Sequence, residues 1–247
     1  MIIRIETYPQ VYARIAGALY LVVILFGAFA EGYVTNALIV PGDPAASAQH
    51  ILGSPGLWQL GIACNLIVAL CAVPQTWIEY LLLRPVDKNL ILLGVFFNLV
   101  SIAIESIAKL FLLAVMPTLA NAGHQNAFDP QQLQALATMA FRSHGIAFNI
   151  SLIFFGFTCL VNGYLVFRSG YFPKVLGVLM QLAGVSYLIA CFSALFAPEL
   201  SDRISPAILL PALIGESSFS LWLLIKGVDI AKWRERLAAQ TSKHVPA

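Results

Sequence analysis

The chain has 247 residues, of which 60% are hydrophobic and 11% are charged. Soluble domains carry about 25% charged residues, so this chain has too few charges to cover a water-facing surface. Its mean hydropathy of +0.84 agrees, and a formal net charge of +2 leaves no surplus of cations for a nucleic acid. Composition therefore excludes a soluble domain and a nucleic-acid partner, and it predicts an integral membrane protein.

Six apolar stretches are long enough to cross a bilayer core of about 30 Å at a helical rise of 1.5 Å per residue. We therefore predict an all-α fold, in which residues 1–247 form a single integral membrane domain, a bundle of six transmembrane helices. All four cysteines fall within the spans rather than in loops, so no framework of extracellular disulfides is expected. The expected spans are residues 13–36, 57–83, 90–117, 136–167, 175–196 and 206–226.

Positive charge alternates from one connection to the next. Eleven of the 14 Lys and Arg residues lie on the side shared by the two termini and the short basic loops 84–88 and 168–174, against one, Arg203, in the opposite loops. Cytoplasmic loops carry the excess of Lys and Arg, so we expect both termini in the cytoplasm and the protein in the inner (plasma) membrane. The eleven are Arg4, Arg14, Arg84, Lys88, Arg168, Lys174, Lys226, Lys232, Arg234, Arg236 and Lys243.

The first span has an alternative interpretation as a secretory signal, because Arg14 precedes an apolar run that contains Ala28-Phe29-Ala30. Cleavage there would leave five spans and an external N-terminus. Glu6, Pro9 and the length of the leader are unusual for a signal peptide, so we expect the span to be retained.

Residues 229–247 are predicted to form a short cytoplasmic helix at the membrane interface. Trp233 and Leu237 lie on one side of it, with Lys232, Arg234 and Arg236 alongside. We expect this helix to rest on anionic lipid, with docking onto a partner protein as the alternative.

The chain contains an internal similarity at an offset of 84 residues. The offset aligns residues 61–65 with 145–149, with four identities in five, and residues 80–84 with 164–168, with three identities in five. Matches of Gly, Asn, Tyr and Arg are harder to obtain by chance in apolar sequence than matches of Leu. We predict that residues 57–117 and 136–196 are parallel copies of one helical hairpin, and the alternative is that lipid-facing segments with an inner Arg look alike.

Ionisable residues within the spans form the candidate site, because each ionised group there costs roughly 2.5 to 3.5 kcal/mol on insertion scales. The carboxylates of Glu105 and Glu216 are expected near mid-membrane, and the other charged residues of the site are expected in the outer half. Ionised side chains within a membrane need polar partners or water, so we predict that these residues form one polar cluster that opens towards the outside. The predicted binding residues are Glu31, Glu105, Lys109, Arg142, His144, Glu216, Asn65 and Asn149.

The alternative for this cluster is a set of ion pairs that fixes the register of the helices. The two asparagines align in the repeat, so interhelical hydrogen bonds are expected from both. Glu79 is expected at the inner border beside Arg84, in an ordinary interfacial position.

Enzyme signatures are missing from the sequence, which has no H-E-x-x-H, no C-x-x-C, no glycine-rich phosphate loop and no nucleophile elbow. We therefore predict no catalytic residue, no cofactor and no metal ion. Glu31, Glu105, Glu216 and His144 could in principle bind a metal, but nearby cations already supply the positive charge that a metal would bring.

Six segments carry a family resemblance: residues 13–17, 84–90, 154–165, 168–173, 176–179 and 211–216. Together they resemble a bacterial membrane family, the domain of unknown function 4386, over nearly the whole chain and most specifically in 168–179. The resemblance implies an uncharacterised multi-pass inner-membrane protein that keeps its first span and has no established activity. It also implies that His144 and Glu216 occupy family positions.

Three functions are open on this basis. The first is a protein that binds or transports a small polar or amphipathic molecule, or a lipid headgroup, with Arg142 and Lys109 holding an anionic group. The second is an accessory membrane subunit whose charges serve assembly, and the third is an intramembrane enzyme that modifies lipid. Membrane lipids are the expected partners, and a small bundle with lipid-exposed Gly and Ala can also form a homo-oligomer.

Overall fold

The computed structural model describes residues 5–120 and 128–242, with side chains up to residue 239. Arg4, Lys243 and the last residues of the predicted tail lie outside the described residues. Every regular element in the described residues is helical, and six helical segments are long and apolar enough to cross a membrane. The chain is therefore an all-α, multi-pass membrane protein, as the hydropathy predicted.

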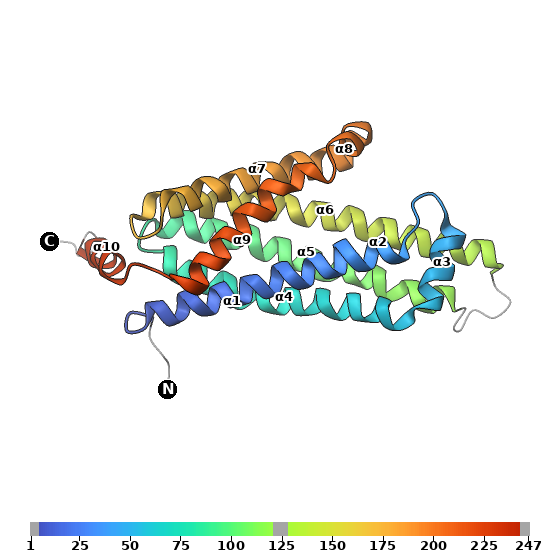
Figure 1. Cartoon of the computed structure of the whole chain (residues 1–247), viewed down its shortest axis with the longest axis horizontal. Coiled ribbons are helices and arrows are strands. Elements are labelled where there is room, and N and C mark those ends of the chain that lie inside the picture. Colours follow the sequence, from blue (N-terminus) through green and yellow to red (C-terminus); the bar gives the residue numbers. More distant parts are fainter. Residues whose placement is uncertain (1–4, 121–127, 243–247) are drawn as a thin grey trace.

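The helices form an elongated bundle in which the start of the first helix and the last helix lie at the same end (Figure 1). We call this the inner end and the opposite one the outer end. The first span is continuous through three segments, α1, η1 and α2, and the short helices α3 and α8 lie at the outer end (Figure 1). The elements are α1 (Pro9–Gly27), η1 (Ala28–Val34), α2 (Thr35–Leu38), α3 (Pro44–Gly53), α4 (Pro55–Leu83), α5 (Lys88–Leu119), α6 (Pro130–Ser169), α7 (Lys174–Phe196), α8 (Pro198–Ile204), η2 (Ala207–Leu209), α9 (Leu210–Ile225) and α10 (Ile230–Ser242).

Helix α6 begins earlier than the predicted span at residue 136. Its first turn is fixed by a capping box, in which the Asp129 carboxylate accepts from the Gln132 backbone N–H at 2.8 Å and the Gln132 side chain accepts from the Asp129 N–H at 2.9 Å. Pro130 at the first helical position needs no N–H partner. The result is a helix of 40 residues, about 60 Å at 1.5 Å per residue, so α6 extends well beyond a bilayer core of about 30 Å.

Glycines bring α6 and α7 into backbone contact. A Cβ on Gly177 would lie 2.6 Å from the Gly163 carbonyl oxygen, and a Cβ on Gly184 would lie 2.7 Å from that of Gly156. Gly156 and Gly163 are seven residues apart on α6, and Gly177 and Gly184 are seven residues apart on α7, so both contacts fall on one face of each helix. Small residues at such a crossing allow the close van der Waals packing that holds helices together in lipid.

Helix α9 crosses the bundle from α7 at the outer end to α1 at the inner end (Figure 1). It meets α1 closely at the inner end, where Gly17 leaves no room for a Cβ beside Leu224 and the Ser220 hydroxyl donates to the Gly17 carbonyl at 3.0 Å. Towards the outer end α9 diverges from α1 (Figure 1). This divergence separates the helices where the polar residues lie.

The inner end is closed by a dense apolar core. Five side chains from three helices are at most 1% exposed there: Leu82, Leu83, Ile91, Leu165 and Val166. Helix α10 packs onto this core rather than presenting its apolar side to lipid, because Trp233 is 0% exposed and its indole N–H donates to the Leu82 carbonyl at 3.0 Å. The Tyr171 hydroxyl donates to the same carbonyl at 2.7 Å, one of the last carbonyls of α4, which have no partner within the helix.

The proposed duplication has a matching arrangement in space, since α4–α5 and α6–α7 are both hairpins that turn at the inner end (Figure 1). That arrangement would also result from unrelated helices, so the repeat stays a prediction.

Candidate functional site

Glu31 lies in η1, a π-helical segment within the first span. Side chains bond to carbonyl groups of this segment as well: the Thr35 hydroxyl donates to the Ala30 carbonyl at 3.3 Å and the Asn36 amide donates to that of Gly32 at 2.5 Å. A π-turn accommodates an extra residue, so it changes the direction of the residues around it, and such turns recur at functional sites. Here the turn carries the carboxylate into the bundle.

Glu31 is the centre of a polar cluster drawn from four spans. Its Oε1 accepts from the Lys109 ammonium at 3.0 Å and from the Asn65 amide at 3.0 Å, and its Oε2 lies 3.4 Å from His144 Nε2. Lys109 also pairs with Glu105 at 3.6 Å, one turn away on α5. We call these five residues the Glu31 cluster, and its grouping agrees with the prediction that these charges find one another.

An aromatic ring contacts two members of the Glu31 cluster. The Lys109 ammonium lies 5.0 Å from the ring centroid of Phe148, and the His144 ring stacks on the same ring at 5.8 Å. Lys109 is 1% exposed, so its charge is removed from water and depends on these partners.

Glu216 belongs to a separate group. Its Oε1 accepts a hydrogen bond from the Tyr187 hydroxyl at 2.5 Å, and the Tyr20 side chain lies nearby. Glu216 is 6% exposed and Tyr20 is 2% exposed. The group therefore joins α1, α7 and α9 without a cation.

One cavity of about 340 Å³ reaches both groups. Its walls come from α1, η1, α4, α5, α6, α7, η2 and α9. The volume falls in the range of small-molecule sites, which are about 300 to 1,000 Å³. Most of the wall is apolar, and the polar residues that line it are Tyr20, Glu31, Asn65, Gln75, Asn98, Ser101, Glu105, Tyr187 and Glu216.

The family model described as "Domain of unknown function (DUF4386)" matches residues 15–227. The chain belongs to this family. It is also similar to a protein from Archaeoglobus fulgidus described as an uncharacterized protein, with 31% identity over 156 residues that cover 62% of this chain and 75% of the relative. No solved structure matches the chain.

Membership of DUF4386 confirms the resemblance and supplies no activity, so function has to be inferred from the geometry. The matched region of DUF4386 contains every residue of the Glu31 cluster as well as Glu216. It ends before α10, so the docked tail helix lies outside the matched region.

The two polar groups lie at different depths, measured from the inner ends of their helices. Glu216 is nine residues from Ile225, or about 14 Å at 1.5 Å per residue, which is mid-membrane. Lys109 is 21 residues from Lys88, or about 32 Å, which is level with the outer border of a core about 30 Å thick. The cavity thus runs from the outer border to the middle of the bilayer.

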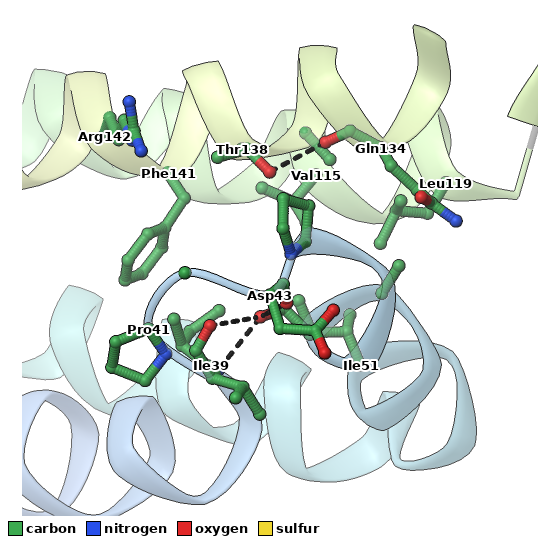
Figure 2. Close-up of a pocket in the computed structure, with 16 residues that line it drawn as sticks. Ile39, Pro41, Asp43, Ile51, Val115, Leu119, Gln134, Thr138, Phe141 and Arg142 are labelled. Carbon is green, nitrogen blue, oxygen red and sulfur yellow. Dashed lines mark hydrogen bonds between the residues drawn. The ribbon is translucent and has the colours of Figure 1, made fainter. Parts of the chain in front are cut away.

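Arg142 does not join the Glu31 cluster. It is exposed and lies at the edge of a second pocket of about 320 Å³ between the 39–44 loop, α3, α5 and α6 (Figure 2). It is 27 residues from the inner end of α6, or about 40 Å, so the long α6 carries it past the bilayer core. Asn149 also stays apart, since its amide donates to the Gly145 carbonyl of its own helix at 2.9 Å.

The sequence suggested an ordinary interfacial position for Glu79. The structure instead buries this side chain inside the bundle, at 5% exposure. Its carboxylate accepts from the Gln75 amide at 3.1 Å and from the Asn162 amide at 2.8 Å, and Arg84 pairs instead with Glu6 at 2.7 Å. Gln75 and Glu79 are four residues apart on α4 and so share one face, which was the available signal for a polar pair in the interior.

Buried acceptors without partners remain in the cavity wall. Within the part of the chain that the structure describes, the carbonyl oxygens of Asn65 and Gln75 have no hydrogen-bond donor. Asn65 must turn its amide N–H towards the Glu31 carboxylate, which leaves its oxygen unpaired at 3% exposure. An unpaired buried acceptor costs about 1 to 3 kcal/mol.

Metal ligation has no geometric support over residues 5–120 and 128–242, where no group of three or more His, Cys, Asp or Glu side chains converges.

Proposed function

We propose that this protein binds an amphipathic amine, with the ammonium group in the cavity near Glu216 and the apolar part along the cavity wall. The observation that carries the proposal is the balance of charge and hydrogen bonding in the wall. Three carboxylates line the cavity, and the nearest cation, Lys109, is already shared by two of them.

The hydrogen-bonding inventory also favours a donor-rich ligand. Carboxylates accept and do not donate when ionised, and the unpaired oxygens of Asn65 and Gln75 are further acceptors. A primary ammonium carries three donors and a positive charge, so it matches this wall better than a carboxylate or phosphate does.

This proposal revises the ligand charge that the sequence suggested. An anionic group would need Arg142 and Lys109 together, but Arg142 is exposed beside the other pocket. Lys109, in turn, is neutralised by Glu31 and Glu105. The residues that could hold an anion are therefore separated or already paired.

The shape of the cavity supports entry from one side. Apolar packing closes the inner end, while the cavity extends to the level of the outer border. The excess of Lys and Arg at the inner end supports a cytoplasmic location for that end. We therefore place the protein in the plasma membrane with both termini in the cytoplasm and the cavity accessible from outside.

The test is a calorimetric titration with four probes that share one six-carbon chain. Hexylammonium has charge and donors, hexyltrimethylammonium has charge without N–H donors, hexanol is neutral and hexanoate has the opposite charge. We expect hexylammonium to bind most tightly, hexyltrimethylammonium more weakly, hexanol at least tenfold more weakly than hexylammonium, and hexanoate not at all.

Variants assign the binding to the cavity. Glu216→Gln should lower the affinity for hexylammonium at least tenfold, because it removes the carboxylate that has no cation beside it. Glu79→Gln is the matched control, since Glu79 is equally buried but does not line the cavity. Equal affinities for hexylammonium and hexanol, or tighter binding of hexanoate, would refute an amine site.

A further inference from the structure

Glu216 differs from the other two cavity carboxylates in what surrounds it. Glu31 and Glu105 contact Lys109, whereas Glu216 accepts a hydrogen bond from the Tyr187 hydroxyl on α7 and has the Tyr20 side chain of α1 nearby. No salt bridge to Glu216 exists within the described part of the chain.

The remaining titratable neighbours of Glu216 are also acids. Cys159 on α6 and Glu79 on α4 are close enough to interact with it electrostatically. Each of them, like Tyr20 and Tyr187, becomes negative when it ionises and none becomes positive. An ionised Glu216 would therefore face no compensating charge from any of the helices packed around it.

The position in the membrane adds to this cost. Glu216 lies about 14 Å into the bundle by helical rise, at a depth where an isolated ionised carboxylate costs at least roughly 2.5 kcal/mol. A carboxyl group in this situation keeps its proton, because the neutral form avoids the cost of burying an unpaired charge. The empty cavity is therefore expected to hold Glu216 as the acid.

We propose that the protein exchanges a proton for the cation that it binds, with Glu216 as the group that carries the proton. The inference rests on the proposed amine site and adds to it the reaction that accompanies binding. The O–H bond of the Glu216 carboxyl breaks, its proton passes to water in the open cavity, and the carboxylate that remains pairs with the cation. One positive charge enters as one leaves, so the charge of the membrane interior is unchanged and no redox change occurs.

The other carboxylates of the cavity are not expected to contribute a proton. Glu31 has Lys109 at 3.0 Å and Asn65 at 3.0 Å, so its ionised form is already paired before any ligand binds. Glu105 shares the same lysine. Glu79 does not line the cavity, so a ligand there cannot pair with it. The expected stoichiometry is thus one proton released for each cation bound.

The experiment uses the full-length protein in mild detergent and hexyltrimethylammonium as the probe. This cation has no proton of its own, so any proton released on binding comes from the protein. Titration calorimetry in two buffers with different ionisation enthalpies gives the number of protons released. We expect about one per cation below neutral pH, and an apparent affinity that rises about tenfold per pH unit while the free protein holds the proton.

Two variants separate the exchange from a structural effect. Glu216→Gln has no acidic proton, so its residual binding should release none and should lose the dependence on pH. Glu79→Gln should still release one proton, and it can fold because the Asn162 amide can turn its unpaired oxygen towards the new N–H.

The outcomes distinguish this inference from the amine site itself. Binding of hexyltrimethylammonium with no proton release would overturn the exchange and leave the binding site standing. Binding of hexylammonium, which is already a cation below neutral pH, with no proton release would overturn it in the same way. Failure of both cations to bind would refute the proposed function.

Discussion

Lys109 is a single lysine held between two carboxylates at the outer border of the membrane. It is 1% exposed, and its ammonium lies 3.0 Å from Glu31 and 3.6 Å from Glu105. Buried ion pairs of this kind contribute little net stability as a whole, but removal of one partner leaves an uncompensated charge. At the scale of single residues the Glu31 cluster is therefore most sensitive to loss of its cation.

Lys109→Met should lower the free energy of unfolding by about 3 to 5 kcal/mol, because two carboxylates then face each other in a buried site. Reversible unfolding in mixed detergent micelles would measure the loss. Lys232→Met is the control, since Lys232 forms an exposed pair with Asp229 and should give no measurable change. Adding Glu31→Gln and Glu105→Gln to Lys109→Met should recover much of the stability, and a Lys109→Met protein as stable as wild type would show that the pairing does not form.

Helices α10 and η1 show how single elements shape the molecule. Trp233 fixes α10 to the inner end, where its indole contributes to the core and bonds to the end of α4. The π-turn η1 places Glu31 in the bundle. The tail therefore stabilises the inner end, and the π-turn positions the cluster at the outer border.

Trp233→Ala should destabilise the protein by about 3 to 5 kcal/mol, the usual cost of truncating a fully buried aromatic side chain. Thermal unfolding in detergent, where no lipid surface is present, measures this directly. Glu235→Ala on the exposed side of the same helix should have little effect. If both variants unfolded at the wild-type temperature, α10 would not be docked, and an interfacial helix resting on lipid would be the better description.

The sequence predicted the spans well because hydropathy over 20 residues reflects the cost of crossing lipid, which few other constraints can override. It missed the first turns of α6, because Pro130 and the glutamines after it suggest a loop until the Asp129 cap is considered. It also missed η1, since a π-helical segment of 7 residues is too short to leave a periodic signal in the hydropathy.

The sequence predicted only part of the candidate site, because the cost of burying charge indicates which side chains need partners but not where each one points. The cost of burying charge predicts that Glu31, Lys109 and His144 find partners, and they do. The same argument does not say which face of an apolar helix points inward. The separation of Arg142 from the cluster and the burial of Glu79 among amides follow from helix length and rotation, which composition does not fix.

The whole molecule is an asymmetric bundle, closed by apolar packing at the inner end and opened by the divergence of α9 towards the outer end (Figure 1). Large apolar side chains cover its flanks, such as Leu70 at 74% exposure and Leu110 at 62%, which is the surface expected to face lipid. An outward-facing cavity follows if the inner end lies in the cytoplasm.

Single cysteines test that orientation in intact cells. Gln49→Cys, on α3 at the outer end, should react with a membrane-impermeant maleimide added outside. Glu235→Cys, on α10 at the inner end, should react only after the membrane is permeabilised, and the wild-type chain, whose four free cysteines all lie in spans, gives the background. The reverse pattern of labelling would place the cavity on the cytoplasmic side.

The most direct test of the amine site is native mass spectrometry of the protein released from mild detergent, with wild type beside Glu216→Gln and Glu79→Gln. We expect wild type and Glu79→Gln to retain a bound amphipathic amine of the same mass, and Glu216→Gln to lose it. A bound molecule that is anionic, or one that Glu216→Gln retains as fully as wild type, would refute the amine site.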